Sequence, residues 1–255
     1  MVDYRMALRC ANLCREVYTP FDSGENPFSE FPNAKVTLIE GSDRGISEDQ
    51  QQLMGKALEE TRTGTQAALI LDEAEGLLYV VFRGSNQPID WINNFQFRQQ
   101  IYPYGDGNQE VKFHRGFMAA YFAVRAEVLK ACKAIEVRKI ITTGHSLGGA
   151  LAVIAALDIE YNITSQKTED IAVYTYGAPR VGNEPMVDSF NRRVPDSSRF
   201  VYGWDIVTRV PRLWQGFTHV EKEFFLGSRW TWQIISRRFT DHAIQNYIDA
   251  LGEKV

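Results

Sequence analysis

One serine lies in a glycine-rich segment of the kind that can present a nucleophile. Residues 144–148 read GHSLG, so Ser146 occupies the centre of the pattern G-x-S-x-G. The pattern is short, and its meaning depends on a strand before it and a helix after it. Residues 139–143 (KIITT) are apolar and β-branched, which predicts a strand, whereas residues 150–157 (ALAVIAAL) predict a helix. We therefore interpret Ser146 as a nucleophile on a sharp strand-to-helix turn; the alternative is a hydroxyl in an ordinary glycine-rich turn.

A serine hydroxyl needs a base to become a nucleophile, and the chain contains four histidines. His145 is adjacent to Ser146 and should point away from it, which favours a structural role. His114 precedes Ser146, whereas the order along the chain for this type of turn is serine, acid, histidine. His242, at the predicted start of the last helix, is the favoured base, and His219 is the alternative.

The acid of such a site should follow Ser146 and lie at the carboxyl end of a strand. Residues 199–204 (RFVYGW) have a strand pattern, and Asp205 comes directly after them. Asp205 would orient His242 and stabilise the charged form of its ring. A turn-capping role is the structural alternative for Asp205. Three further carboxylates are less well placed for this role: Asp188, Asp196 and Asp241.

A tetrahedral oxyanion needs hydrogen-bond donors that are already in position. The backbone N–H of Leu147, directly after the nucleophile, is one candidate. The second is the N–H of Ser85, helped by its hydroxyl, because the predicted strand at residues 77–82 ends just before it. Asp90 could hold the Ser85 side chain in place. The alternative is that residues 84–85 only form a turn at the end of the strand.

The elements that would position these residues alternate between strands and helices. Short apolar runs predict strands at residues 36–39, 67–71, 77–82, 139–143, 171–176 and 200–204. Helical patterns lie at the start of the chain and at residues 115–134, 146–160, 184–193 and 241–251. This order predicts a mostly parallel sheet with helices on both faces, in one domain over residues 1–255. The short link at residues 72–76 allows the first strands to pair as an antiparallel hairpin.

Composition excludes several classes of function. The net charge is −4 and no basic run stands out, which gives no support for nucleic-acid binding. No apolar run is long enough to span a bilayer, and the first residues have no signal-peptide core, so we expect a cytoplasmic protein. A sequence shortened at its start would also allow secretion. The three cysteines suggest reduced thiols, and no cluster of metal ligands is visible; we expect neither a metal nor a cofactor.

Several motifs together resemble the class-three lipase family, which includes the filamentous-fungal triacylglycerol lipases. They fall in the expected order and are VVFRGSNQPIDWINN, FHRGFMAAY, ITTGHSLGGALA, VYTYGAPRVGN, DIVTRVP and a final HxxxxY at residues 242–247. The resemblance implies an α/β-hydrolase-type fold and hydrolysis of carboxylic esters. It also implies Ser146 as nucleophile, Asp205 as acid, His242 as base, and Ser85 and Leu147 as oxyanion donors. In this family the position of His219 is held by a histidine that is not catalytic.

The same resemblance implies a short lid helix after Ser85. Residues 87–95 carry an apolar stripe at helical spacing, which fits a lid whose apolar face opens onto lipid. The residues expected to form it and to contact substrate are Pro88, Ile89, Trp91, Ile92 and Phe95. The structural alternative is a helix packed permanently on the core. The sequence differs from the secreted fungal members in lacking cysteine pairs and a signal peptide.

The predicted activity is hydrolysis of acylglycerols through an acyl-enzyme, with a lipid or other ester substrate met at a lipid–water interface. The apolar lid stripe and the many aromatic residues favour acyl chains over sugars. Phospholipase, galactolipase and feruloyl esterase activities fit the same motifs and stay open as alternatives. A binding module without catalytic activity is the alternative from a different class of protein.

Overall fold

The centre of the molecule is a seven-stranded sheet with the strand order β1-β2-β3-β6-β7-β8-β9. The computed structural model describes residues 2–20, 26–42, 46, 48, 51, 64–85, 98–101, 111–164, 170–227 and 240–255. The strands of this sheet are β1 (Lys35–Glu40), β2 (Gln66–Asp72), β3 (Leu77–Phe82), β6 (Lys139–His145), β7 (Asp170–Tyr176), β8 (Ser197–Tyr202) and β9 (Glu223–Leu226). A separate pair joins β4 (Gln99–Ile101) to β5 (Lys112–His114).

The sheet is antiparallel at one edge and parallel elsewhere. Strands β1, β2 and β3 pair as a meander, and the link from β2 to β3 contains Gly76 at φ +63. From β3 to β9 every neighbouring pair is parallel. The carboxyl ends of these parallel strands therefore meet at one edge, which is where open α/β sheets place their ligands. Both the parallel sheet and the antiparallel start agree with the prediction.

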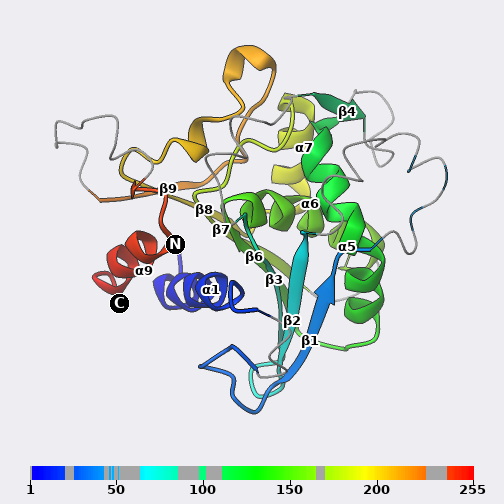
Figure 1. Ribbon diagram of the computed structural model, residues 1–255, viewed down its shortest axis with the longest axis vertical. Helices are drawn as coiled ribbons and strands as arrows, with labels where there is room; N and C mark the ends of the chain where they lie inside the picture. Colours follow the sequence, from blue (N-terminus) through cyan, green and yellow to red (C-terminus); the bar gives the residue numbers. More distant parts are fainter. Residues whose placement is uncertain are drawn as a thin grey trace.

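Helices cover both faces of the sheet, as Figure 1 shows. Helices α5 (Arg115–Lys133), α6 (Leu147–Asn162) and α7 (Glu184–Arg193) lie on one face, and α1 (Tyr4–Glu16) and α9 (Ile244–Gly252) lie together on the other. Each side has its own apolar core, because the side chains of the parallel strands alternate between the two faces. Helix α6, next to the sheet centre, is buried along almost its whole length.

The structure differs from the predicted elements at a few points. Strand β8 ends at Tyr202, two residues earlier than predicted, and α9 begins at Ile244, three residues later. Both candidate residues lie outside helices and strands: Asp205 directly follows the turn at residues 203–204, and His242 lies in a turn before α9. Strands β4, β5 and β9 have three or four residues each and escape detection by periodicity.

Candidate active site

Ser146 lies on a tight turn between β6 and α6. Its backbone has φ 59 and ψ −127, a conformation that non-glycine residues rarely adopt and that costs about 1–3 kcal/mol. Surrounding hydrogen bonds hold it there: the Ser146 N–H donates to the Tyr176 carbonyl at 2.9 Å, and its carbonyl accepts from Gly149 at 3.0 Å. Strain that is held in this way is common at functional sites and agrees with the predicted turn.

Two glycines of the G-x-S-x-G pattern make this turn sterically feasible. A Cβ added at Gly144 would overlap the Gly148 carbonyl, and one added at Gly148 would overlap the Phe82 carbonyl of β3. The strand end and the helix start therefore approach each other more closely than side chains would permit. This crowding explains why the two positions of the pattern are glycines.

The structure brings Ser146, His242 and Asp205 into one hydrogen-bonded chain. The Nε2 atom of His242 lies 2.8 Å from Ser146 Oγ, and its Nδ1 atom lies 2.8 Å from Asp205 Oδ2. A carboxylate can only accept, so Nδ1 carries the hydrogen, and Nε2 of the neutral ring is free to accept the serine proton. This is the tautomer that a general base for Ser146 requires. All three side chains are buried, with exposed fractions of 0% for Ser146 and Asp205 and 3% for His242.

Asp205 accepts two further hydrogen bonds that the sequence does not reveal. The hydroxyl of Tyr247 on α9 donates to Oδ2 at 2.6 Å, and the N–H of Val207 donates to Oδ1 at 2.8 Å. Burial, and then the Asp205 charge, raise the pKa of Tyr247, so its hydroxyl keeps its proton. A buried carboxylate needs such donors, since its desolvation would otherwise be costly. The spacing of His242 and Tyr247 in the HxxxxY motif was the available signal for this contact.

Gly177, directly after β7, gives the carboxylate and the imidazole room to meet. It has φ +57, and a Cβ added there would lie 2.6 Å from Asp205 Oδ2 and 3.0 Å from His242 Nδ1. Neither distance permits a side chain without movement of the Asp205–His242 pair. Gly177 belongs to the motif VYTYGAPRVGN, where sequence reasoning assigned it no role.

His145 supports the backbone that carries His242. Its Nε2–H donates to the His242 carbonyl at 2.7 Å, and the Tyr18 hydroxyl lies 3.3 Å from its Nδ1. Burial, and then the neighbouring His242, lower the pKa of His145, so the ring is neutral and Nδ1 can accept from Tyr18. A structural role for His145 agrees with the sequence interpretation. The contribution of Tyr18 comes from a segment 127 positions away and could not be predicted.

The other two histidines lie away from Ser146. His219 donates from Nε2 to the Thr208 carbonyl at 2.5 Å and so supports the loop after Asp205. His114 caps the start of α5, where its Nδ1 accepts from the Phe117 N–H at 3.4 Å. Burial lowers the pKa of both rings, that of His114 to about 3. Of the histidine candidates for the base, His242 is the one that contacts the serine.

The alternative acids also have other positions. Asp188 is exposed on α7, and Asp196 pairs with Lys139. Asp241 is adjacent to His242, yet its Oδ2 accepts a hydrogen bond from the backbone N–H of Trp204 at 2.8 Å. This bond fixes the turn after β8. Asp205 is the carboxylate that contacts His242 Nδ1.

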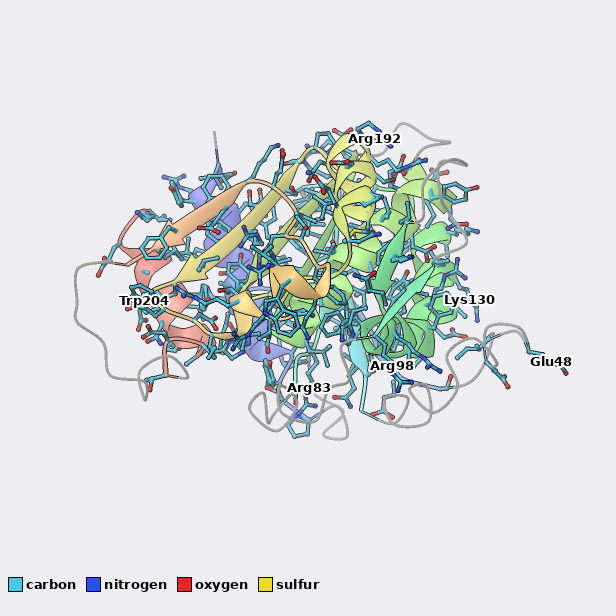
Figure 2. The ribbon with its side chains drawn as sticks, turned by 90° about the horizontal axis from the view of Figure 1, so that it is seen from above. Glu48, Arg83, Arg98, Lys130, Arg192 and Trp204 are labelled. Atoms are coloured by element: carbon cyan, nitrogen blue, oxygen red, sulfur yellow. The ribbon has the colours of Figure 1, made fainter. Side chains whose placement is uncertain are left out.

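The segments that carry the two expected oxyanion donors both pass close to Ser146. Leu147 is the first residue of α6, so its N–H has no acceptor within the helix. Ser85 follows β3 and Arg83, which Figure 2 labels at the carboxyl end of that strand. A Cβ added at the intervening Gly84 would lie 3.4 Å from Ser146 Cβ, so this loop passes beside the serine. Asp90 and the expected lid residues Pro88, Ile89, Trp91, Ile92 and Phe95 lie outside the described residues.

The described part of the chain has neither a cluster of metal ligands nor a membrane-spanning helix. No three side chains of histidine, cysteine, aspartate or glutamate gather there in a way that could hold a metal ion. None of the helices found there is long and apolar enough to cross a bilayer.

The parallel sheet, the strained serine turn and the Ser146–His242–Asp205 chain together define a protein of the α/β-hydrolase class. Comparison with known proteins identifies the family. Residues 79–214 match the family model described as lipase (class 3). This match extends over more than half of the 255 residues. The chain belongs to the class 3 lipase family.

Individual relatives agree with this assignment. The chain is 33% identical over 166 residues to a lipase of Rhizomucor miehei, a match that covers 64% of this chain and 45% of that protein. It is 33% identical over 170 residues to the secreted mono- and diacylglycerol lipase 1 of Fusarium solani, a match that covers 65% of this chain and 49% of that protein. A solved structure of a deletion variant of the Rhizomucor miehei lipase–propeptide complex superposes with a TM-score of 0.67 and 26% identity, over 88% of this chain and 65% of that one. The chain spans about half the length of the curated relatives it matches.

Proposed function

We propose that this protein is a serine carboxylic-ester hydrolase that acts on acylglycerols. The observation that carries the proposal is the pair of 2.8 Å contacts that join Ser146 Oγ, the His242 ring and the Asp205 carboxylate. In this mechanism Ser146 Oγ attacks the ester carbonyl carbon while His242 Nε2 takes its proton. The alcohol leaves with that proton, and water then attacks the acyl-enzyme with His242 again as base.

The developing oxyanion would be stabilised by the N–H groups of Leu147 and Ser85. Leu147 stands at the start of a sixteen-residue helix, and the partial positive charge of the helix N-terminus adds to its hydrogen bond. Each such donor is worth about 10²- to 10³-fold in turnover. Asp205 keeps the His242 ring in the correct tautomer throughout and stabilises its charged form.

The acylglycerol assignment rests on the family and on the names of the relatives, two of which are a lipase and a mono- and diacylglycerol lipase. Burial of Ser146 adds a physical argument. Its side chain has no exposed surface, so an ester reaches it only after a conformational change. We propose that residues 87–95, with their apolar stripe, form the segment that covers Ser146. A lipid–water interface would then favour the change, because the apolar stripe can contact lipid.

The experiment is an assay of p-nitrophenyl esters with two to sixteen carbons, beside a Ser146→Ala control. Turnover that needs Ser146 and peaks at long chains supports a lipase. A peak at short chains contradicts the acylglycerol assignment and leads to a test of feruloyl esters. If turnover on a long-chain phospholipid or galactolipid exceeds turnover on a triacylglycerol, the protein is a phospholipase or galactolipase instead of an acylglycerol lipase. Absence of Ser146-dependent turnover at every length would favour the non-catalytic binding module.

A further inference from the structure

A cavity of about 320 Å³ lies beside β8 and β9 and is distinct from the candidate active site. One of the residues that line it is Trp204, which Figure 2 labels near the edge of the molecule close to these strands. Within the described residues, its lining comes from β8, β9 and the loops after β7 and β8, and includes none of Ser146, Asp205 and His242. The mechanism proposed above makes no use of this space.

Three buried donor atoms belong to residues that line this cavity. Arg180 Nε, Arg199 Nη1 and Trp204 Nε1 have no hydrogen-bond acceptor among the residues that the structure describes. All three can only donate, and leaving a buried donor unsatisfied is costly because the group has lost its water. A native structure rarely leaves several such groups together, which points to an acceptor from outside the chain. The three atoms have almost no accessible surface, so such an acceptor reaches them only once the outer side chains Trp204 and Arg209 move.

The arginine side chains are held in place by their remaining nitrogens. Arg199 is 7% exposed; its Nε donates to the Val220 carbonyl at 3.2 Å, and its Nη2 donates to Glu223 at 3.0 Å. Arg180 Nη1 donates to the Arg209 carbonyl at 2.6 Å and to the Pro211 carbonyl at 2.8 Å. The two guanidinium groups are therefore fixed before a ligand arrives, which lowers the entropic cost of binding one.

The charge balance around the cavity is positive. Arg180, Arg199 and Arg209 line it, and Glu223 is the carboxylate among the described lining residues. His219 contributes no charge, because burial, and then the nearby Arg199, lower its pKa. Burial, and then the charges of Arg199 and Arg209, lower the pKa of Arg180 as well. A guanidinium stays protonated in proteins, and Glu223 offsets only part of the positive charge through its ion pair with Arg199.

We propose that this cavity binds a phosphate group, either as the free ion or as part of a small phosphorylated head group. Arg180 lies after β7, whereas Arg199 and Trp204 belong to β8 and the turn after it. Three donors suit the several oxygens of a tetrahedral anion better than the two of a carboxylate. Apolar lining from Val201 and Phe225 leaves space for an organic substituent on the phosphate.

Arg209 and Trp204 form the adjustable side of the site. The Arg209 guanidinium carbon lies 4.7 Å from the centroid of the Trp204 ring, a cation–π contact in which the guanidinium keeps its charge for a ligand. Arg209 is exposed, unlike Arg199, so it can move to meet the anion. The indole of Trp204 also supplies a spectroscopic signal, because its environment changes when the Nε1–H is engaged.

The test is a calorimetric and fluorescence titration of the full chain with inorganic phosphate, replaced stepwise for chloride at constant ionic strength. We expect saturable binding with one phosphate per chain. Trp204→Phe, which keeps an aromatic six-membered ring and removes the indole N–H, should weaken binding about tenfold, as should Arg209→Gln. Trp214→Phe is the matched control, because Trp214 is 78% exposed and does not line the cavity, and it should bind phosphate like the unaltered protein.

Thermal unfolding of each variant, without phosphate, checks that it is folded. The proposal would be overturned if binding does not saturate up to about 10 mM phosphate, because a dissociation constant above that concentration is too weak for a specific site. Equal affinities of Trp204→Phe, Arg209→Gln and the unaltered chain would overturn it too. Glycerol 3-phosphate distinguishes the two sources: tighter binding than inorganic phosphate indicates a head group, and equal binding indicates the free ion. Ester hydrolysis is not involved in any of these measurements, so the site is tested independently of the proposed function.

Discussion

Replacing Gly177 by alanine should disable the site although no reacting group is itself replaced. The added Cβ would lie 2.6 Å from Asp205 Oδ2 and 3.0 Å from His242 Nδ1, roughly 0.5–1 Å inside an ordinary contact. Because Asp205 is fixed by three donors, the carboxylate and the ring must separate. A displacement of about 1 Å in a catalytic group can cost on the order of 10²-fold in turnover, which is the loss we expect in kcat/KM.

The same variant should also lose stability. Alanine at the Gly177 φ of +57 costs about 1–2 kcal/mol, and the overlap with the buried pair adds about 1–3 kcal/mol. Urea unfolding measures this change in the free energy of unfolding, and hydrolysis of a p-nitrophenyl ester measures the activity. Gly252→Ala is the matched control, because no atom lies within 4 Å of its added Cβ, and it should change neither quantity by much. Turnover of Gly177→Ala within about threefold of the unaltered protein would refute the steric argument.

Three further outcomes follow from the contacts of the site and from its buried histidines. Asp205→Asn should lower kcat by about 10³- to 10⁴-fold at neutral pH while KM changes little, and a loss below tenfold would show that His242 does not depend on it. Tyr247→Phe keeps the ring but removes the 2.6 Å bond to Asp205, so urea unfolding should register a loss of about 1.5–3 kcal/mol; an unchanged midpoint would mean that the bond adds nothing. Burial lowers the pKa of His114, His145 and His219 in the folded state. The free energy of unfolding therefore has the full contribution of these neutral rings above about pH 6.5 and decreases as the pH drops toward 3. With three protons taken up on unfolding, the slope near pH 5.5 should approach about 4 kcal/mol per pH unit, and a flat stability profile between pH 7 and 5 would contradict these directions.

Much of the fold follows from local patterns in the sequence. Strands such as residues 139–143 and helices such as residues 150–157 carry their periodicity within a few residues, so they can be recognised one at a time. The candidates Ser146, Asp205 and His242 could be proposed in the same way, because each follows a strand or precedes a helix in a predictable order. The structure brings these three side chains together, as the sequence analysis expected.

What could not be predicted depends on contacts between distant segments. Tyr18 reaches His145 across 127 positions, and the alternative acid Asp241 instead accepts the Trp204 N–H. The role of Gly177 depends on where β7 ends relative to two other loops. The cavity is similar, since Arg180 and Arg209 belong to two different sequence motifs and nothing in either motif shows that they line one space. The hydrophobic periodicity of a segment does not show which distant segments it contacts.

The most direct test of the central claim is to label the nucleophile with a fluorophosphonate, whose phosphorus bonds to the serine oxygen as fluoride leaves, and to locate the adduct by peptide mass spectrometry. The account predicts one adduct per chain, on Ser146 in the peptide that contains GHSLG. It also predicts that labelling slows by several orders of magnitude in His242→Ala, whereas His219→Ala, if folded, labels at a near-normal rate, because His219 does not contact the serine. An adduct on another residue, or labelling of Ser146 that is independent of His242, would contradict the account.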